Sequence, residues 1–386
     1  MLHPSIMLVS GDNASDRFGA GLARALHRAA PDVRLFGIGG WQMQEAGVDI
    51  LYNTADLDNL GILDAFKGGA VLKRVVRRAN QMMEDHRPMV VVQIGLPVFD
   101  YRLMDMARCK DIPVVYYYTP FSSGFVTTKP DRLSGLVSVV AAVTQKEADV
   151  WRRAGVPTEF VGHPLVDLVQ PVAKEQAREH LGLSLDEVVV TLIPGSRDVE
   201  VKAALPLLLK AAERVHEAMP EVAFVVAQPQ GVSKESFDRF LTRADAKFVQ
   251  FSEFSSLAVQ AADVAVLHGG TAVLEAALFG IPALAVYKIP TATYLMDKML
   301  ERKAHWAMPN ILLEASVVPE LIQHDFTESK TADWILALLR NPELRQTMRE
   351  RYSELAEQVG PEGALERAAQ LILSTAVRSE DQAKRG

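Results

Sequence analysis

One loop in the second half of the sequence has the composition of a phosphate-binding turn. It follows the apolar run 188–193, precedes a long helical pattern, and consists of Pro194, Gly195, Ser196 and Arg197. Glycine allows close backbone approach, the helix N-terminus supplies oriented N–H groups, and Arg197 offers a bidentate positive charge. The loop therefore predicts a diphosphate site, with a tight turn and a surface arginine as the alternative. Glu200, in the first helical turn, is expected to interact with the helix dipole.

A second loop, rich in glycine, follows the apolar run 264–267 and opens another helix. Its residues are His268, Gly269, Gly270 and Thr271. The backbone N–H groups and the Thr271 hydroxyl suit phosphate, and Glu275, one helical turn further on, suits two ribose hydroxyls. Two such loops on one sheet predict a nucleotide diphosphate site. Capping of the helix by Thr271 is the alternative.

Short apolar strands alternating with helices would position both loops. Strands without polar alternation are typical of a parallel sheet buried on both faces. They are expected at 6–9, 34–37, 89–94, 113–118, 139–143, 188–193, 223–227, 247–251, 264–267 and 283–287. Helical spacing predicts helices over 174–181 and 201–219. Ligands bind beyond the carboxyl ends of such strands, where both loops lie.

The pattern occurs twice, which predicts an α/β protein of two doubly wound, Rossmann-like domains. The first spans 1–168 and the second 169–342, because Pro164 and Pro171 interrupt the chain between them. Residues 343–376 are expected to form C-terminal helices that pack back across the domains. A frayed tail at 377–386 completes the chain.

Charge and cysteine content exclude several functional classes. With 41 Lys and Arg against 48 Asp and Glu, the net charge of −7 argues against a general affinity for nucleic acid. The single cysteine, Cys109, excludes an intramolecular disulfide and a multi-cysteine zinc site, and is expected to be buried. The N-terminal apolar run is too short for a signal peptide, and no run is long enough to span a membrane. We expect a cytoplasmic or peripheral protein.

Motifs along nearly the whole chain resemble one known family. They are Phe36-Gly37-Ile38-Gly39-Gly40 with Met43 and Gly47, Phe160-Val161-Gly162-His163-Pro164-Leu165, Pro194-Gly195-Ser196-Arg197 with Glu200, Gly270-Thr271-Ala272-Val273-Leu274-Glu275, Pro282, Tyr287-Lys288, Thr293-Tyr294, Pro309-Asn310-Ile311-Leu312 and Val318-Pro319-Glu320-Leu321-Ile322-Gln323. In this order they resemble the lipid-A-disaccharide synthase family. The combination is specific, although each motif alone is not.

The resemblance implies a GT-B fold, with two domains facing a cleft, and a role in lipid A biosynthesis. The implied reaction transfers 2,3-diacylglucosamine from its UDP-linked form to 2,3-diacylglucosamine 1-phosphate, with inversion and without a metal or other cofactor. By resemblance, Arg197 binds the diphosphate and Glu275 the ribose, while Asn310 and Gln323 line the donor pocket. These roles fit physically, because a departing UDP carries negative charge that a guanidinium and N–H groups stabilise. His163 is expected at the cleft or as a packing residue at the domain junction.

Three loops in the first half depart from the family pattern. The usual Gly-Glu-Ala-Ser-Gly-Asp is replaced by residues 11–16, Asp-Ala-Pro-Asp-Phe by 95–99, and Trp-Ala-Trp-Arg by 121–126. The expected general base is lost at Val98, which cannot accept a proton. The carboxylates that remain as candidate bases are Asp100, Asp12 and Asp16. For each of them the alternative is an acid that caps a turn or helix.

Residues 61–80 combine an apolar face with a basic one. This pattern is typical of a helix at the surface of an anionic bilayer, and a lipid substrate would favour attachment at the inner face of the cytoplasmic membrane. An ordinary packed amphipathic helix is the alternative, and Gly68 and Gly69 weaken a continuous helix. Exchange of the long C-terminal helices between protomers would give a homodimer.

The departures in the first half leave other functions open. A divergent relative would use a UDP-sugar with another acceptor. A catalytically inactive relative would bind a nucleotide sugar without turnover. A sugar-nucleotide 2-epimerase, which has a similar fold, would form a new sugar epimer without any acceptor.

Overall fold

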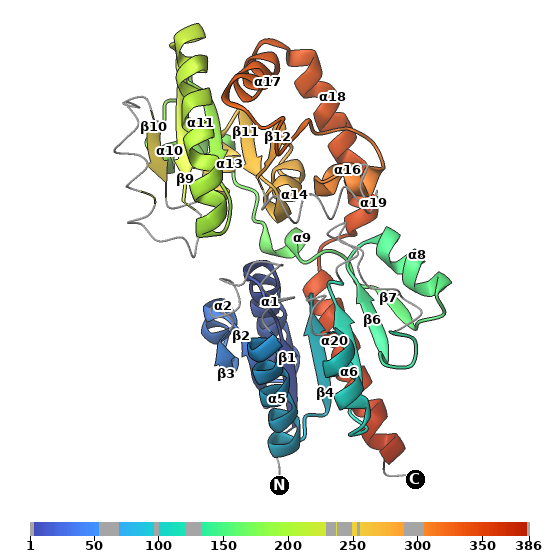
Figure 1. The fold of residues 1–386 in the computed structure, drawn as a ribbon. Helices are drawn as coiled ribbons and strands as arrows, with labels where there is room; N and C mark the ends of the chain where they lie inside the picture. The colour runs from blue at the N-terminus through green and yellow to red at the C-terminus, as the bar shows by residue number, and fades with distance from the viewer. Residues whose placement is uncertain are drawn as a thin grey trace. The chain divides into compact units, whose positions relative to one another are not determined.

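The chain folds into two compact units, each built on a parallel β-sheet (Figure 1). The structure is a computed structural model that describes residues 4–53, 69–95, 100–119, 133–228, 237, 249–252, 255–288 and 305–383. One unit comprises Met1–Leu168 with Ala356–Gly386, and the other comprises Val169–Leu355. The α/β architecture predicted from the alternating pattern is confirmed.

The sheet of the first unit has the strand order β3-β2-β1-β4-β5-β6-β7. Its strands are β1 (Ser5–Val9), β2 (Arg34–Gly39), β3 (Asp49–Asn53), β4 (Val90–Ile94), β5 (Val114–Tyr117), β6 (Val139–Ala142) and β7 (Thr158–Phe160). Strands β1, β4 and β5 are buried throughout, as expected for a parallel sheet covered on both faces. The strand order reverses where β1 lies between β2 and β4, which places a topological switch point there.

Helices cover this first sheet. They are α1 (Asn13–Ala29), α2 (Trp41–Glu45), α5 (Gly69–His86), α6 (Asp100–Arg108), α8 (Gln145–Arg153), α9 (Leu165–Leu168) and α20 (Ala364–Ala383). The C-terminal helix α20 lies beside α1 and contacts β4, β5 and β6 (Figure 1). The end of the chain therefore completes the first unit.

The sheet of the second unit has the order β10-β9-β8-β11-β12-β13. Its strands are β8 (Val188–Ile193), β9 (Val222–Ala227), β10 (Val249–Ser252), β11 (Val264–His268), β12 (Ala283–Tyr287) and β13 (Glu320–Ile322). Its helices are α10 (Lys174–Leu181), α11 (Asp198–Ala218), α13 (Ser255–Ala261), α14 (Gly270–Leu278), α16 (Met308–Leu313), α17 (Glu328–Arg340) and α18 (Pro342–Ser353). Strands β8 and β11 pair directly, so the loops that follow them are neighbours.

The C-terminal helices are shared between the units. Helix α18 contacts α14 and α17 in the second unit, whereas α20 belongs to the first. The short helix α19 (Leu355–Val359) lies where the chain passes from one unit to the other. Residues 343–376 therefore do not form one group.

Two expectations need correction. Cys109 is exposed rather than buried, because it follows the last turn of α6 at the protein surface. The helix expected over 61–80 begins at Gly69 and continues to His86, and residues 61–68 lie outside the described residues. Among the described helices, none has the length and apolar character needed to cross a bilayer.

Candidate functional site

The Pro-Gly-Ser-Arg loop connects β8 to α11 at the carboxyl edge of the second sheet. Gly195 has a φ of +131°, and a Cβ there would lie 2.5 Å from the Cβ of Glu200, so this position requires glycine. The Ser196 backbone N–H donates to Oε2 of Glu200 at 2.8 Å. Arg197 is the N-cap residue of α11, and its side chain makes no capping hydrogen bond. The loop thus presents a half-buried guanidinium beside a helix N-terminus.

The second loop connects β11 to α14 along the same edge. Gly269 is the N-cap residue with a φ of +52°, and a Cβ there would lie 2.8 Å from the Tyr287 ring. Gly270 has a φ of +66° and is exposed. Thr271 lies inside α14 rather than at its cap, so the capping alternative does not hold. Glu275 is also on α14 and only 7% exposed.

His268 connects the two loops to the neighbouring strand ends. Its Nε2 accepts the backbone N–H of Lys288 at 3.1 Å, and its Nδ1 lies 3.9 Å from Oε2 of Glu200. Burial lowers the pKa of His268, and the Glu200 carboxylate partly offsets this effect. The Lys288 side chain donates to the backbone oxygen of Gln323 at 3.0 Å, so one chain of contacts spans the ends of β8, β11, β12 and β13.

Asn310 supports this edge through a saturated set of hydrogen bonds. Its Nδ2 donates to the Val318 oxygen at 2.7 Å and to Oε1 of Glu320 at 2.9 Å. Its Oδ1 accepts the backbone N–H groups of Val317 and Val318, both at 2.8 Å. A primary amide has two donor hydrogens and two acceptor sites, and all four are used. Asn310 is 1% exposed and fixes the turn that leads into β13.

Gln323 directly follows β13 and has an unusual backbone conformation. It has a φ of +51° and donates its backbone N–H to the Tyr287 oxygen at 2.9 Å. Its side chain is 6% exposed. A non-glycine residue with positive φ is uncommon and is tolerated where surrounding contacts fix it. The structure thus brings Gln323 to the same strand edge as the two loops.

Two of the three candidate bases in the first unit, Asp12 and Asp16, are engaged in capping helices. Oδ1 of Asp12 accepts the Ser15 backbone N–H at 2.8 Å and caps α1. Asp16 is 2% exposed and accepts the N–H groups of Gly40 at 2.6 Å and Gln42 at 3.0 Å, at the start of α2. Burial raises the pKa of Asp16, although these backbone bonds oppose the rise. The capping alternative therefore describes both carboxylates.

Asp100 is placed differently from the other two candidates. It is the first residue of α6, which follows β4 along the chain. Residues 96–99, including Val98, lie outside the described residues. Asp100 thus belongs to the segment beyond the carboxyl end of a central strand, where ligands bind in doubly wound sheets.

His163 is a buried packing residue in the first unit. Its Nδ1 accepts the Leu165 backbone N–H at 3.2 Å, and its ring packs edge-on against Phe18 and Tyr118, with centroids 5.7 and 5.8 Å away. Burial lowers the pKa of His163 to about 3, so its imidazole is neutral. Its environment matches the packing role.

Sequence reasoning missed Glu147, which connects two strand ends in the first unit. Its Oε1 accepts both the hydroxyl and the N–H of Thr119, at 2.6 and 3.1 Å, and its Oε2 accepts the Val143 N–H at 2.8 Å. Burial raises the pKa of Glu147 to about 7. The signal that identifies it is the spacing of Thr144 and Glu147, because Thr-x-x-Glu marks a helix start.

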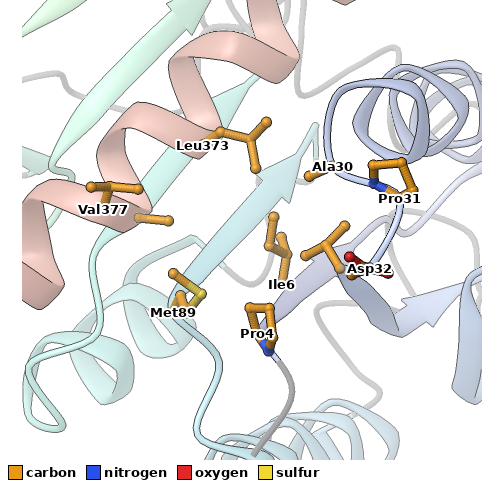
Figure 2. A pocket seen from close by; sticks show the side chains of 10 residues that line it. Pro4, Ile6, Ala30, Pro31, Asp32, Met89, Leu373 and Val377 are labelled. Carbon is orange, nitrogen blue, oxygen red and sulfur yellow. The ribbon is translucent and has the colours of Figure 1, made fainter.

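Three further features lie outside the two loops. On α5, Val75, Ala79, Met82 and Met83 pack into the core of the first unit, whereas Lys73, Arg74, Arg77 and Arg78 are exposed. Figure 2 shows an apolar pocket at the amino ends of β1 and β4, away from their carboxyl ends; it is lined by Pro4, Ile6, Ala30, Pro31, Asp32, Val33, Met89, Leu373, Ala376 and Val377. Among the described residues, no cluster of His, Cys, Asp and Glu has the composition of a metal site.

Comparison with known proteins places the chain in a family. A model of the lipid-A-disaccharide synthetase family matches residues 6–374. A lipid-A-disaccharide synthase from Syntrophus aciditrophicus (strain SB) is 34% identical over 377 residues, which cover 97% of this chain and 98% of that protein.

Two solved structures share the fold at low sequence identity. A UDP-GlcNAc 2-epimerase from Neisseria meningitidis, bound to UDP-GlcNAc, has a TM-score of 0.64 at 13% identity and covers 97% of this chain and 100% of that chain. A calicheamicin glycosyltransferase has a TM-score of 0.63 at 15% identity and covers 98% of this chain and 99% of that chain. The expected GT-B fold is confirmed, and the chain belongs to the lipid-A-disaccharide synthetase family of glycosyltransferases.

Proposed function

We propose that this protein transfers 2,3-diacylglucosamine from its UDP-linked form to 2,3-diacylglucosamine 1-phosphate, with inversion, without a metal, and with release of UDP. One observation carries the donor side of this proposal. A Cβ at Gly195 would lie 3.4 Å from Nδ1 of His268, so the two phosphate-suited loops are immediate neighbours. Two adjoining anion-suited loops match the size and charge of a nucleoside diphosphate. The solved epimerase that binds UDP-GlcNAc shares this fold.

Each loop residue has a role that follows from its chemistry. Gly195, Ser196, Arg197, Gly270 and Thr271 bind the two phosphates through backbone N–H groups, hydroxyls and the guanidinium. Glu275 accepts hydrogen bonds from the ribose. Gln323 borders the donor sugar, and Asn310 fixes the turn that leads into β13, the strand that Gln323 follows.

The chemical step breaks the bond between the anomeric carbon and the UDP oxygen. The acceptor hydroxyl attacks that carbon from the opposite face, its proton passes to a carboxylate, and the bonding electrons leave with UDP. Arg197 and the helix N-terminal N–H groups stabilise the charge that grows on the diphosphate. We assign the base to Asp100, because Asp12 and Asp16 are engaged in capping helices.

The acceptor is a glycolipid, so we also propose that the protein works at the inner face of the cytoplasmic membrane. The exposed basic side chains of α5, namely Lys73, Arg74, Arg77 and Arg78, support this part of the proposal. Cations near an anionic bilayer each contribute about 1 kcal/mol of attraction. The packed apolar face of α5 argues for electrostatic attachment rather than insertion of this helix. A homodimer formed by exchange of C-terminal helices stays a prediction.

The test is turnover of UDP-2,3-diacylglucosamine with 2,3-diacylglucosamine 1-phosphate in detergent micelles, following UDP and disaccharide together. We expect one disaccharide for each UDP released. A panel of other acceptors is tested in the same way. If UDP is released only with one of them, the protein is a divergent relative that uses another acceptor. UDP binding without turnover on any acceptor would identify an inactive nucleotide-sugar binder, and a new UDP-sugar without acceptor would identify an epimerase.

A further inference from the structure

The phosphate-suited loop after β8 already holds an anion of the protein itself. Oε2 of Glu200 accepts the Ser196 N–H at 2.8 Å, and the Ser196 hydroxyl lies 3.4 Å from the same oxygen. These are the polar groups that a bound diphosphate would use. The carboxylate of Glu200 therefore takes the place of a phosphate oxygen.

The backbone of the loop permits this contact. Glu200 lies in the first turn of α11, and its side chain folds back over Gly195, where a Cβ would lie 2.8 Å from Oε2. Any other residue at position 195 would push the carboxylate away from the loop. The absence of a Cβ at Gly195 thus allows the hydrogen bond between Glu200 and Ser196 as well as the approach of a ligand.

A second partner for the carboxylate lies on the next strand end. Since Nε2 of His268 accepts the Lys288 N–H, the hydrogen of the neutral ring is on Nδ1. This Nδ1 is 3.9 Å from Oε2 of Glu200, too far for a hydrogen bond and close enough to form one after a small rotation. Glu200 is partly exposed and has room to turn, whereas His268 is buried and fixed.

We propose that Glu200 is a carboxylate gate on the diphosphate site: it holds the Ser196 N–H in the free protein and turns to Nδ1 of His268 when a nucleoside diphosphate binds. This inference rests on the proposed function of the Pro-Gly-Ser-Arg loop. Two anions cannot share the same N–H groups without strong repulsion, so the carboxylate must leave before the phosphate enters. The gate lowers affinity for free UDP and thereby favours product release.

The test is calorimetric titration of the full chain with uridine, UMP and UDP, comparing the natural protein with Glu200→Gln. Glutamine keeps the size and one acceptor oxygen but removes the competing charge. We expect UDP to bind about tenfold more tightly to Glu200→Gln, as expected for loss of one close like charge, with uridine unchanged. The matched control is Glu217→Gln on the exposed face of α11, which changes the net charge equally and should leave all three affinities unchanged.

The role of His268 gives an independent readout. His268→Gln keeps an acceptor for the Lys288 N–H but alters the alternative partner of Glu200. We expect it to weaken UDP binding several-fold in the natural background and to have no effect in the Glu200→Gln background. Thermal unfolding followed by circular dichroism checks that each variant is folded. If Glu200→Gln does not fold, Glu200→Asp withdraws the carboxylate from the loop and should tighten UDP binding as well.

The outcomes separate this inference from the proposed function. If Glu200→Gln binds UDP more weakly than the natural protein or equally well, the gate is overturned but the donor site remains. The gate is also overturned if the affinity for uridine changes by the same factor as the affinity for UDP. If UDP binds neither protein, the assignment of the diphosphate loop fails and the gate fails with it.

Discussion

The carboxyl edges of the two sheets use their polar groups in opposite ways. In the first unit, Asp12 caps α1, Asp16 holds the start of α2, and Thr144 with Glu147 caps α8. In the second unit, α11 and α14 begin at Arg197 and Gly269 without a side-chain cap. The same doubly wound topology thus yields one edge saturated by its own side chains and one open edge, where no side chain caps α11 or α14 and only Glu200 holds the preceding Ser196 N–H.

This difference follows from where the helix N-terminal N–H groups find partners. Each helix leaves its first N–H groups without backbone partners, and a capping side chain satisfies them at the expense of ligand binding. An edge with glycine and arginine at these positions keeps its N–H groups available for phosphate. A missing cap alone does not identify the site, because α10 and α16 also begin without one, at Ala173 and Ala307. The glycine turns and Arg197 distinguish the starts of α11 and α14.

The largest effect is expected from removing the guanidinium of the open edge. Arg197→Ala should lower kcat/KM by about 1,000-fold, because the charge on departing UDP loses its bidentate partner. Arg197→Lys should recover part of this loss, since lysine retains the charge without the fork. Arg214→Ala, at an exposed ion pair with Glu328 on α17, is the control. Unchanged turnover in Arg197→Ala would remove the diphosphate assignment.

The next largest effect is expected in the first unit. Asp100→Asn should lower kcat by about 100-fold by removing the general base, while UDP affinity stays unchanged. Asp105→Asn, an exposed position on the same helix, provides the matched control. Initial rates and calorimetry on the same samples measure both quantities. Full activity of Asp100→Asn would contradict the assignment of Asp100 and return the role of base to Asp12 or Asp16.

Substitution of Asn310 should lower the free energy of unfolding of the protein. Asn310→Ala leaves the half-buried N–H of Val317 and the buried N–H of Val318 without their acceptor and should cost about 3 kcal/mol of unfolding free energy. Denaturant unfolding measures this loss. Asn310→Asp restores the acceptor but sets a second carboxylate against Oε1 of Glu320, so we expect it to be no more stable than Asn310→Ala. A fully stable Asn310→Ala protein would show that this turn does not depend on the side chain.

The smallest effect is a pH dependence from Glu147 in the saturated edge. Its folded pKa of about 7 lies above the ordinary 4.5, so the folded state binds the proton more tightly. The resulting stability is fully present below pH 4.5 and is lost as pH rises through 7. The difference in unfolding free energy between the natural protein and Glu147→Gln should show this slope.

Taking the difference between the two proteins also removes the opposing contribution of His163 to the pH dependence of the unfolding free energy. The folded pKa of His163, about 3, lies below its ordinary 6.5, so its stability is present above pH 6.5 and lost as pH falls. Both proteins contain His163, and the subtraction cancels it. A flat difference curve between pH 4.5 and 7 would show that Glu147 stays ionised in the folded protein.

Most of the sheets could be predicted from the sequence. The buried strands form continuous apolar runs, and all ten expected runs correspond to strands. The strands that were not predicted are β3, β7 and β13, which lie at sheet edges and are partly exposed. Edge strands need no continuous apolar run, so their sequences look like loops. The return of α20 to the first unit depends on contacts distant in sequence, which no local pattern encodes.

The loops of the candidate site could be predicted from the sequence, but the hydrogen bonds that connect their residues could not. The Pro-Gly-Ser-Arg and glycine-rich loops follow apolar strands, which is visible in sequence. The engagement of Asp16 with Gly40 and the saturation of Asn310 depend on three-dimensional contacts. Such contacts decide whether a polar residue is available to a ligand, and they cannot be predicted from composition or local sequence.

The most direct measurement of the contrast between the two edges is amide hydrogen exchange of the full chain with and without UDP. UDP should slow exchange at residues 195–197 and 269–272 of the second unit and leave residues 11–16 of the first unit unchanged. Protection of residues 11–16, or no protection at 195–197, would contradict the assignment of the open edge as the donor site.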